Sequence, residues 1–167
     1  RVPAPLVNLT AMATSVPANM SAKTGVSLTR AVMLSANMMK AYGQYRWSKD
    51  VMKGEVKLPK DVVTLFEEIQ RNGWDQAQFN RESLSVLKSK VGNAFEGLIE
   101  KGMLGFAITE QINRVATIAG SYMAIKEQAA KTGKAFDHKK ALELAKEVSD
   151  KSHGDYTKAN KPTITRG

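Results

Sequence analysis

Apolar residues recur three and four positions apart along most of the chain, and no segment alternates in the way that a strand does. The first long run, residues 27–54, predicts one helix that is broadly buried, because its apolar arc is wide. Its methionines either fill the core or form an adaptable binding surface, since methionine repacks easily. The apolar positions are Ala31, Leu34, Met38, Tyr42 and Tyr45, widened by Leu28, Val32, Met33 and Met39.

A second helix is predicted between Pro59 and Gly73, where the start and stop signals agree. Pro59 suits the first helical position, Asp61 favours the positive end of a helix, and Gly73 is a typical stop. In residues 74–102 we expect two short helices with a bend between them, because glycines weaken a helix interior. The interrupting glycines are Gly92, Gly97 and Gly102.

The strongest helical pattern covers residues 105–133, and Asp137 then begins a last helix that we expect to end at Gly154. Because only a few residues connect these two helices, they should be antiparallel neighbours. Glu110 and Arg114 are spaced as an ion pair on the face opposite the apolar stripe. Beside that stripe, small residues recur every four positions and would let another helix approach closely. These small residues are Ala116, Gly120 and Ala124.

Together these segments predict an all-α fold, an irregular helical bundle with an extended N-terminal arm and an extended C-terminal strap. The arm is expected because Pro3, Pro5 and Pro17 block a helix. In the strap, Lys161 precedes Pro162, which favours extended backbone. We also expect the chain to be a fragment of a larger polypeptide, since it begins without Met. The predicted divisions are residues 1–26 for the arm, 27–102 for a helical region with a glycine-broken middle, and 103–167 for an antiparallel helical hairpin plus its closing strap.

Catalytic and metal-binding patterns are missing from the sequence. The chain has no cysteine, which excludes disulfides, thiolate metal ligands and a cysteine nucleophile. His138 and His153 flank one helix about four turns apart, so they cannot share a metal ion on it, and we expect both at exposed helix ends. There is no serine elbow and no glycine-rich phosphate loop. We therefore expect no catalytic residue, no cofactor, no metal site and no enzymatic activity in this segment.

The net charge of the chain is +9, with basic stretches on both sides of an acidic middle. This distribution suits contact with nucleic acid or an anionic membrane surface, although a solvated lysine-rich face is the plainer interpretation. We do not expect residues 103–125 to span a membrane, because charged and amide side chains lie near the middle of that run. The candidate contacts for nonspecific DNA or RNA binding lie on the first long helix and are Arg30, Lys40, Arg46 and Lys49.

Two stretches, TEQINRVATIAGSYMAIKEQAAKTGKAFDHKKALELAKEV and SHGDYTKANKPTITRG, carry a family resemblance. A polar cluster is followed by two alanine-rich helices separated by a glycine, and then by a polar closing segment. This ordered combination, over roughly residues 105–167, resembles a helical domain found near the end of very large polyvalent proteins of tailed bacteriophages. Proteins with this module are similar to those packaged in the capsid and passed into the bacterium with the genome, including internal ejection proteins and giant virion RNA polymerases.

The resemblance implies a non-catalytic structural or docking module, because the enzymatic domains of such chains lie elsewhere. Its partners would be other regions of the same long chain and other virion proteins. Its location would be the virion, and then the host cell after ejection. The alternative is a basic nucleic-acid-binding accessory region of a virion-packaged RNA polymerase or DNA-handling protein. The resemblance also implies a structural polar network that ties the closing strap to the long helix, formed by Glu110, Asn113, Arg114, Tyr156 and Asn160.

Overall fold

Five helices make up most of the described part of the chain, which in this computed structural model comprises residues 13–49, 55–75 and 93–153. No strand occurs among those residues, so the predicted all-α class is confirmed. In chain order the helices are α2 (Ser15–Thr24), α3 (Leu28–Trp47), α4 (Lys60–Arg71), α6 (Asn93–Thr132) and α7 (His138–His153).

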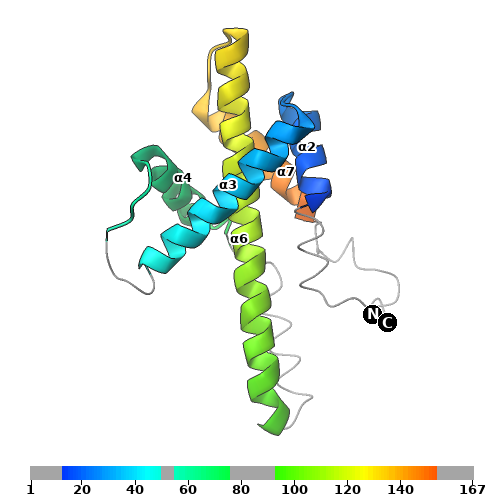
Figure 1. The fold of residues 1–167 in the computed structure, drawn as a ribbon, viewed down its shortest axis with the longest axis vertical. Helices are drawn as coiled ribbons and strands as arrows, with labels where there is room; N and C mark the ends of the chain where they lie inside the picture. Colours follow the sequence, from blue (N-terminus) through cyan, green and yellow to red (C-terminus); the bar gives the residue numbers. More distant parts are fainter. Residues whose placement is uncertain (1–12, 50–54, 76–92, 154–167) are drawn as a thin grey trace.

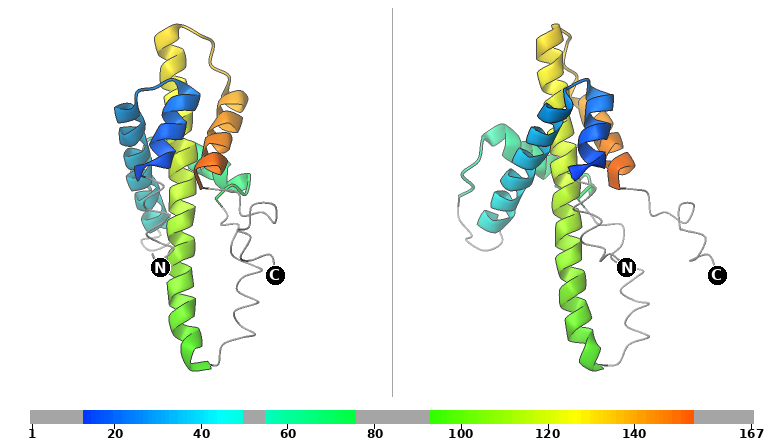
Figure 2. Two further views of the ribbon diagram at one scale, coloured as in Figure 1. Left: turned by 90° about the vertical axis from the view of Figure 1, so that its right-hand side faces the viewer. Right: turned by 45° about the vertical axis from the view of Figure 1, so that its right-hand side comes forward.

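The long helix α6 is the axis against which the other helices pack (Figure 1). Helix α3 crosses it obliquely, with α2 and α7 near the first end of α3 and α4 near the other end. Figure 2 shows α7 running back beside the last part of α6. The first part of α6 extends beyond the other described helices in every view. The core therefore surrounds the second half of α6.

Local signals fix several helix ends. The side chains of Ser27 and Asp137 accept hydrogen bonds, at 3.2 and 3.0 Å, from backbone N–H groups three residues later. These caps satisfy donors that the first turn of a helix leaves without a partner. Gly133 follows α6 with a φ of 65°, a left-handed conformation that glycine adopts without strain. Pro59 is the residue before α4, which begins at Lys60, one position later than predicted.

One apolar cluster joins the second half of α3 to α4, α6 and α7. The ring centroids of Tyr42 and Phe66 lie 5.1 Å apart in an edge-on arrangement, and Tyr42 stacks on Tyr45 at 5.8 Å. Both phenols reach a polar partner in the same amide, because Gln70 donates to the Tyr42 hydroxyl and accepts from the Tyr45 hydroxyl. Aromatic rings with satisfied hydroxyl groups thus fill the space between α3 and α4.

A second apolar cluster joins α2, the first half of α3, α6 and α7. Two residues of the predicted small-residue ridge, Ala116 and Ala124, are fully buried in it. The other members come from α2, α3, α7 and the connection between α2 and α3, and they are Val16, Met20, Val26, Ala31, Leu34 and Val148.

The prediction that residues 1–26 form an extended arm is wrong for its last part, because Ser15–Thr24 form helix α2. Pro17 lies in the first turn, where a helix has no use for the N–H that proline lacks. Val16 and Met20 are fully buried, so the helix is stabilised by burial of its apolar side chains in the second cluster. Pro3 and Pro5 lie outside the described residues.

The predicted break among the glycines is also wrong where the structure describes it, because α6 continues without interruption through Gly97 and Gly102. A glycine in a helix interior costs only about 1 kcal/mol relative to alanine, and each added residue contributes a hydrogen bond to a helix that is already nucleated. Helix α3 ends at Trp47, earlier than the predicted Gly54, and both Gly54 and Gly92 lie outside the described residues.

Candidate functional site

A buried polar centre lies on α6 at three residues of the predicted polar network, Glu110, Asn113 and Arg114. These residues are at most 3% exposed, and the Arg114 guanidinium donates from Nε to Glu110 Oε1 at 3.2 Å. The predicted pair is confirmed, but the face opposite the apolar stripe is buried and not exposed to solvent. Residues 113–122 are all buried, so this stretch of α6 has no solvent-facing side at all. A buried ion pair is strongly coupled, because removal of either partner leaves the other charge buried without compensation.

His153, the last residue of α7, belongs to the same buried centre. Its Nε2 lies 2.9 Å from the hydroxyl oxygen of Thr117, which itself donates to the carbonyl oxygen of Asn113 at 2.7 Å. A neutral imidazole can donate to this hydroxyl through Nε2–H or accept from it through Nε2, according to its tautomer. Burial, together with the charge of Arg114, lowers the pKa of His153 to about 4. The prediction of an exposed His153 is therefore wrong, and the ring is a neutral structural group at pH 7.

Several polar atoms of this centre have no hydrogen-bond partner among the residues that the structure describes. They are Glu110 Oε2, Asn113 Nδ2 and Arg114 Nη2. A buried polar atom without a partner costs about 1–3 kcal/mol, so the centre is less than fully satisfied. The other two predicted members of the network, Tyr156 and Asn160, lie outside the described residues.

Three of the four candidate nucleic-acid contacts are engaged with other side chains. Arg30 forms an ion pair with Glu127 of α6 at 2.9 Å, and Arg46 donates to Gln111 of α6. The Lys49 ammonium lies 3.1 Å from Glu67 of α4 and 4.8 Å from the centre of the Tyr45 ring. These contacts join α3 to α4 and α6.

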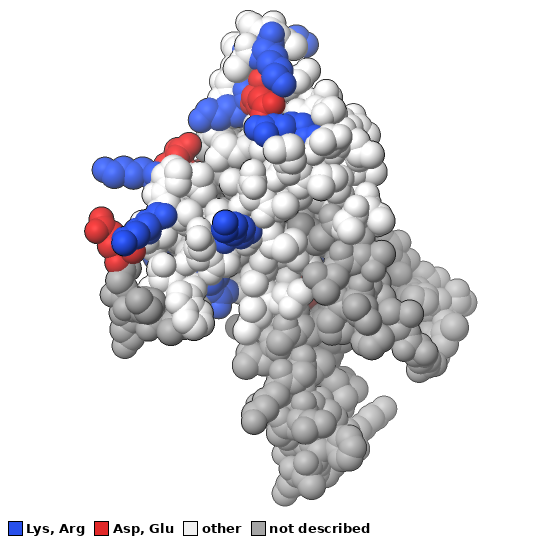
Figure 3. Space-filling view, viewed as in Figure 1, with Lys and Arg blue, Asp and Glu red and all other residues white. Residues whose placement is uncertain are grey.

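Lys40 is the fourth candidate, and it is exposed without a hydrogen bond or an ion pair to any described residue. Figure 3 shows the basic side chains on the α3 side of the molecule as separate groups on largely uncharged surface, some of them beside acidic side chains. The structure therefore does not bring the four candidate contacts together in one basic patch.

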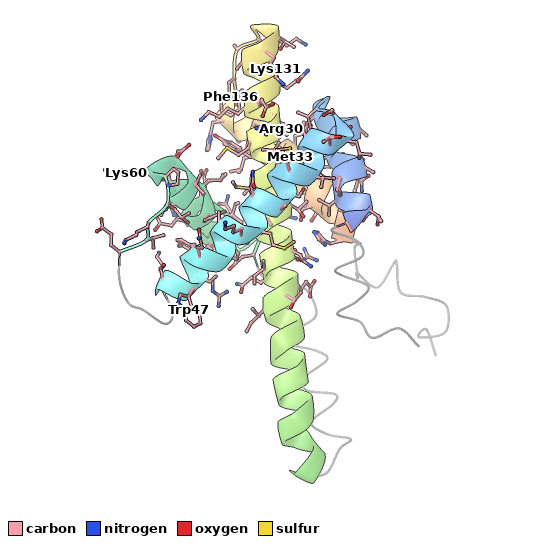
Figure 4. All side chains as sticks on the ribbon, viewed as in Figure 1. Arg30, Met33, Trp47, Lys60, Lys131 and Phe136 are labelled. Atoms are coloured by element: carbon pink, nitrogen blue, oxygen red, sulfur yellow. The ribbon has the colours of Figure 1, made fainter. Side chains whose placement is uncertain are left out.

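The outer face of α3 is apolar and exposed. The exposed fractions are 56% for Leu28, 46% for Val32, 49% for Met33 and 61% for Trp47. Figure 4 labels Met33 and Trp47 at well separated positions along this helix. Between them lie two small residues, Ala36, which is exposed, and Gly43, where an added Cβ would meet no atom within 4 Å. We call this set the α3 face: Leu28, Val32, Met33, Ala36, Gly43 and Trp47.

The expectation that Leu28, Val32 and Met33 are buried is thus wrong. Helix α6 and its neighbours cover one side of α3, where Leu34, Tyr42 and Tyr45 are buried. The width of the apolar arc of α3 could have indicated an exposed apolar face, because packing against one side of a helix covers only part of so wide an arc. The interpretation of the methionine-rich arc as an adaptable binding surface stays open for this side of the helix.

His138, which is about half exposed as the sequence predicts for a helix end, connects three helices. Its Nε2 lies 3.0 Å from the Glu68 carboxylate of α4, and its Nδ1 lies 2.8 Å from the Tyr122 hydroxyl of α6. Burial, with the charges of Glu68 and Asp61, raises the pKa of the Tyr122 phenol. These three side chains line a small cavity with Thr64, Leu65, Met123, Lys126 and Asp61.

The side chains of Glu68, His138 and Tyr122 form a hydrogen-bonded chain across three helices. Its raised pKa makes the Tyr122 phenol a poorer acid than an ordinary tyrosine. The Glu68 carboxylate orients the imidazole of His138 through its contact with Nε2. The arrangement holds α4, α6 and α7 together. Within the described ranges, no group of three or more His, Asp or Glu side chains could hold a metal ion.

None of the helices, over the residues that the structure describes, has the length and apolar character needed to cross a membrane. Comparisons of the chain with protein-family models, with curated proteins and with solved structures give no match.

Proposed function

We propose that this chain is a non-catalytic docking module of a large tailed-bacteriophage virion protein, packaged in the virion and delivered into the host with the genome. The resemblance of residues 105–167 to the helical module of polyvalent phage proteins supports the virion setting. The observation that carries the docking function is the α3 face, on which four large apolar side chains are 46–61% exposed.

Scattered exposed apolar residues are normal on a protein surface, whereas several on one face of a single helix indicate an interaction site. The other large apolar side chains with comparable exposure among the described residues, Ile108 and Phe136, lie outside α3. The α3 face therefore differs from the rest of the described surface, and it accounts for most of the large exposed apolar groups.

The α3 face is held in place before any partner binds. Helix α3 packs along α6, and the Arg30–Glu127 and Lys49–Glu67 ion pairs fasten it at both ends. A preformed helical surface loses little conformational freedom on binding, which favours association. Rigidity of this kind suits a structural module whose task is to position neighbouring parts of a virion.

Nucleic-acid binding is less well supported by the same contacts. Counterion release requires lysine and arginine side chains that are free to reach phosphates, and three of the candidates are already paired with protein groups. For this reason the accessory nucleic-acid-binding role is not the function that we propose.

The virion setting can be tested by mass spectrometry of purified particles of the phage that encodes the chain. We expect peptides of this chain in DNA-filled particles and a lower amount in particles that have ejected their genome. Absence of the peptides from filled particles would exclude the virion setting.

The docking role can be tested in the same phage with Val32→Glu combined with Met33→Glu. Charges on the α3 face should oppose burial of the face and reduce incorporation of the module into particles. Ala130→Glu is the matched control, because it adds a carboxylate at an exposed position of α6 away from this face. Normal incorporation of a correctly folded Val32→Glu, Met33→Glu variant would exclude docking through α3.

A further inference from the structure

We infer that the α3 face binds an amphipathic helix of another protein segment, with a carboxylate of that helix against Lys40. This inference rests on the proposed docking function and specifies the chemistry of the partner. It uses the charge, the shape and the periodicity of the face.

All charged side chains of α2 and α3 are positive. These two helices contain no Asp or Glu, and none occurs in the first 49 residues of the chain. Lys40 lies between Ala36 and Gly43 and has no partner within the described residues. A partner that covers the apolar side chains also removes water from this ammonium group, and a buried lysine requires a carboxylate to offset the loss of hydration.

The shape of the face suits a helix. Ala36 and Gly43 carry little or no side chain, and they lie between the larger groups Val32 and Trp47. Small residues separated by two helical turns let another helix approach closely, while the larger side chains at each end fit into its grooves. An apolar stripe at helical spacing along a whole element is the pattern by which helices recognise each other.

A second copy of this chain is a poor occupant. Each copy carries a net charge of +9, so two copies repel each other, and a twofold arrangement of two α3 helices would bring the two Lys40 side chains near each other. A nucleic acid is also a poor occupant, because the face offers one unpaired cation among apolar groups, whereas affinity for phosphates depends on several.

The experiment uses the full chain and two synthetic helical peptides with the same leucine positions, one with Glu and the other with Lys on the flanking positions. Fluorescence anisotropy of labelled peptide gives the affinity. We expect the Glu peptide to bind more tightly than the Lys peptide, and Lys40→Glu to weaken the Glu peptide roughly tenfold while strengthening the Lys peptide. Lys134→Glu, which makes the same charge change at an exposed residue after α6, should alter neither affinity.

Other outcomes would overturn the inference. Equal binding of both peptides, unaffected by Lys40→Glu, would keep a docking face but reject an acidic partner. Absence of binding by either peptide would reject the helix partner, and the virion experiment with Val32→Glu and Met33→Glu would still decide whether the face docks at all. Sedimentation showing a dimer that Val32→Glu dissociates would identify a second copy as the occupant. Displacement of the Glu peptide by duplex DNA would identify a nucleic acid.

Discussion

Gly120 of α6 lies against the backbone of Leu34 in α3, so that a Cβ built on Gly120 would be 3.4 Å from the Leu34 carbonyl oxygen. The same Cβ would be 3.2 Å from the end of the Met20 side chain of α2. Three helices thus meet where residue 120 has no side chain. The sequence indicates this contact through its small-residue ridge, although it does not indicate which helices approach.

Replacement of Gly120 by valine should lower the free energy of unfolding by about 1–3 kcal/mol, because the added methyl groups would push α2 and α3 away from α6. Gly43→Val is the matched control, since it makes the same change in a helix where nothing lies within 4 Å of the new Cβ. Urea unfolding followed by circular dichroism compares the two variants. Equal losses of stability would show that helix propensity, and not the close approach, explains the effect.

Stability should fall as the pH decreases from 6.5 toward 4, because the folded state depresses the pKa of His153 from its ordinary value of 6.5 to about 4. In this window the unfolded chain binds a proton that the buried imidazole does not. Above 6.5 neither state binds it, so the contribution to stability is complete there. A shift of this size corresponds to roughly 3 kcal/mol at its full extent.

The measurement is urea unfolding at several pH values between 7 and about 4.5, a range chosen to stay above the ordinary carboxylate pKa values. His153→Gln should remove most of the pH dependence, because glutamine does not titrate. His138→Gln, at the other end of α7, should keep it, because His153 is still present. A pH dependence that survives in His153→Gln would place its origin in other groups.

The Glu110–Arg114 pair should be more costly to break than to replace. Arg114→Met alone leaves the Glu110 carboxylate buried without its partner and should lower the free energy of unfolding by about 3–5 kcal/mol. The double variant Glu110→Leu, Arg114→Met should recover a large part of this loss, because it removes both charges. Thermal and urea unfolding of the wild type, the two single variants and the double variant form a double-mutant cycle. Independent, additive losses would contradict a coupled pair.

The sequence shows that one broad face of α3 is apolar, but it does not show which of these apolar residues other helices cover. Leu28 and Leu34 carry the same side chain, yet Leu28 is 56% exposed and Leu34 only 6%. The difference depends on where α6 crosses α3, which is a long-range property. Arg114 shows the opposite difference: its charge suggests exposure to solvent, yet it is buried because helices surround this part of α6.

The cap residues are more predictable, since their role depends only on neighbouring residues. Asp137 accepts a hydrogen bond from the first turn of α7, and Gly133 has the left-handed conformation expected at a helix stop. Pro17 is misleading because a proline blocks a helix interior but not its first turn. The burial of His153 is not predictable, because nothing in the local sequence shows that the end of α7 packs against Thr117.

Single alanine substitutions should separate the structural role of the basic α3 residues from a nucleic-acid role. Removal of one side chain that binds phosphate should make the slope of log affinity for DNA against log salt concentration shallower by roughly 1. We expect Arg30→Ala to leave this slope unchanged and to reduce stability by less than about 1 kcal/mol, since its ion pair with Glu127 is partly exposed. Lys139→Ala, at an exposed position of α7, controls for the removal of one positive charge. Fluorescence anisotropy with duplex DNA across a salt series gives the slopes, and a shallower slope confined to Arg30→Ala would favour the accessory nucleic-acid role over docking.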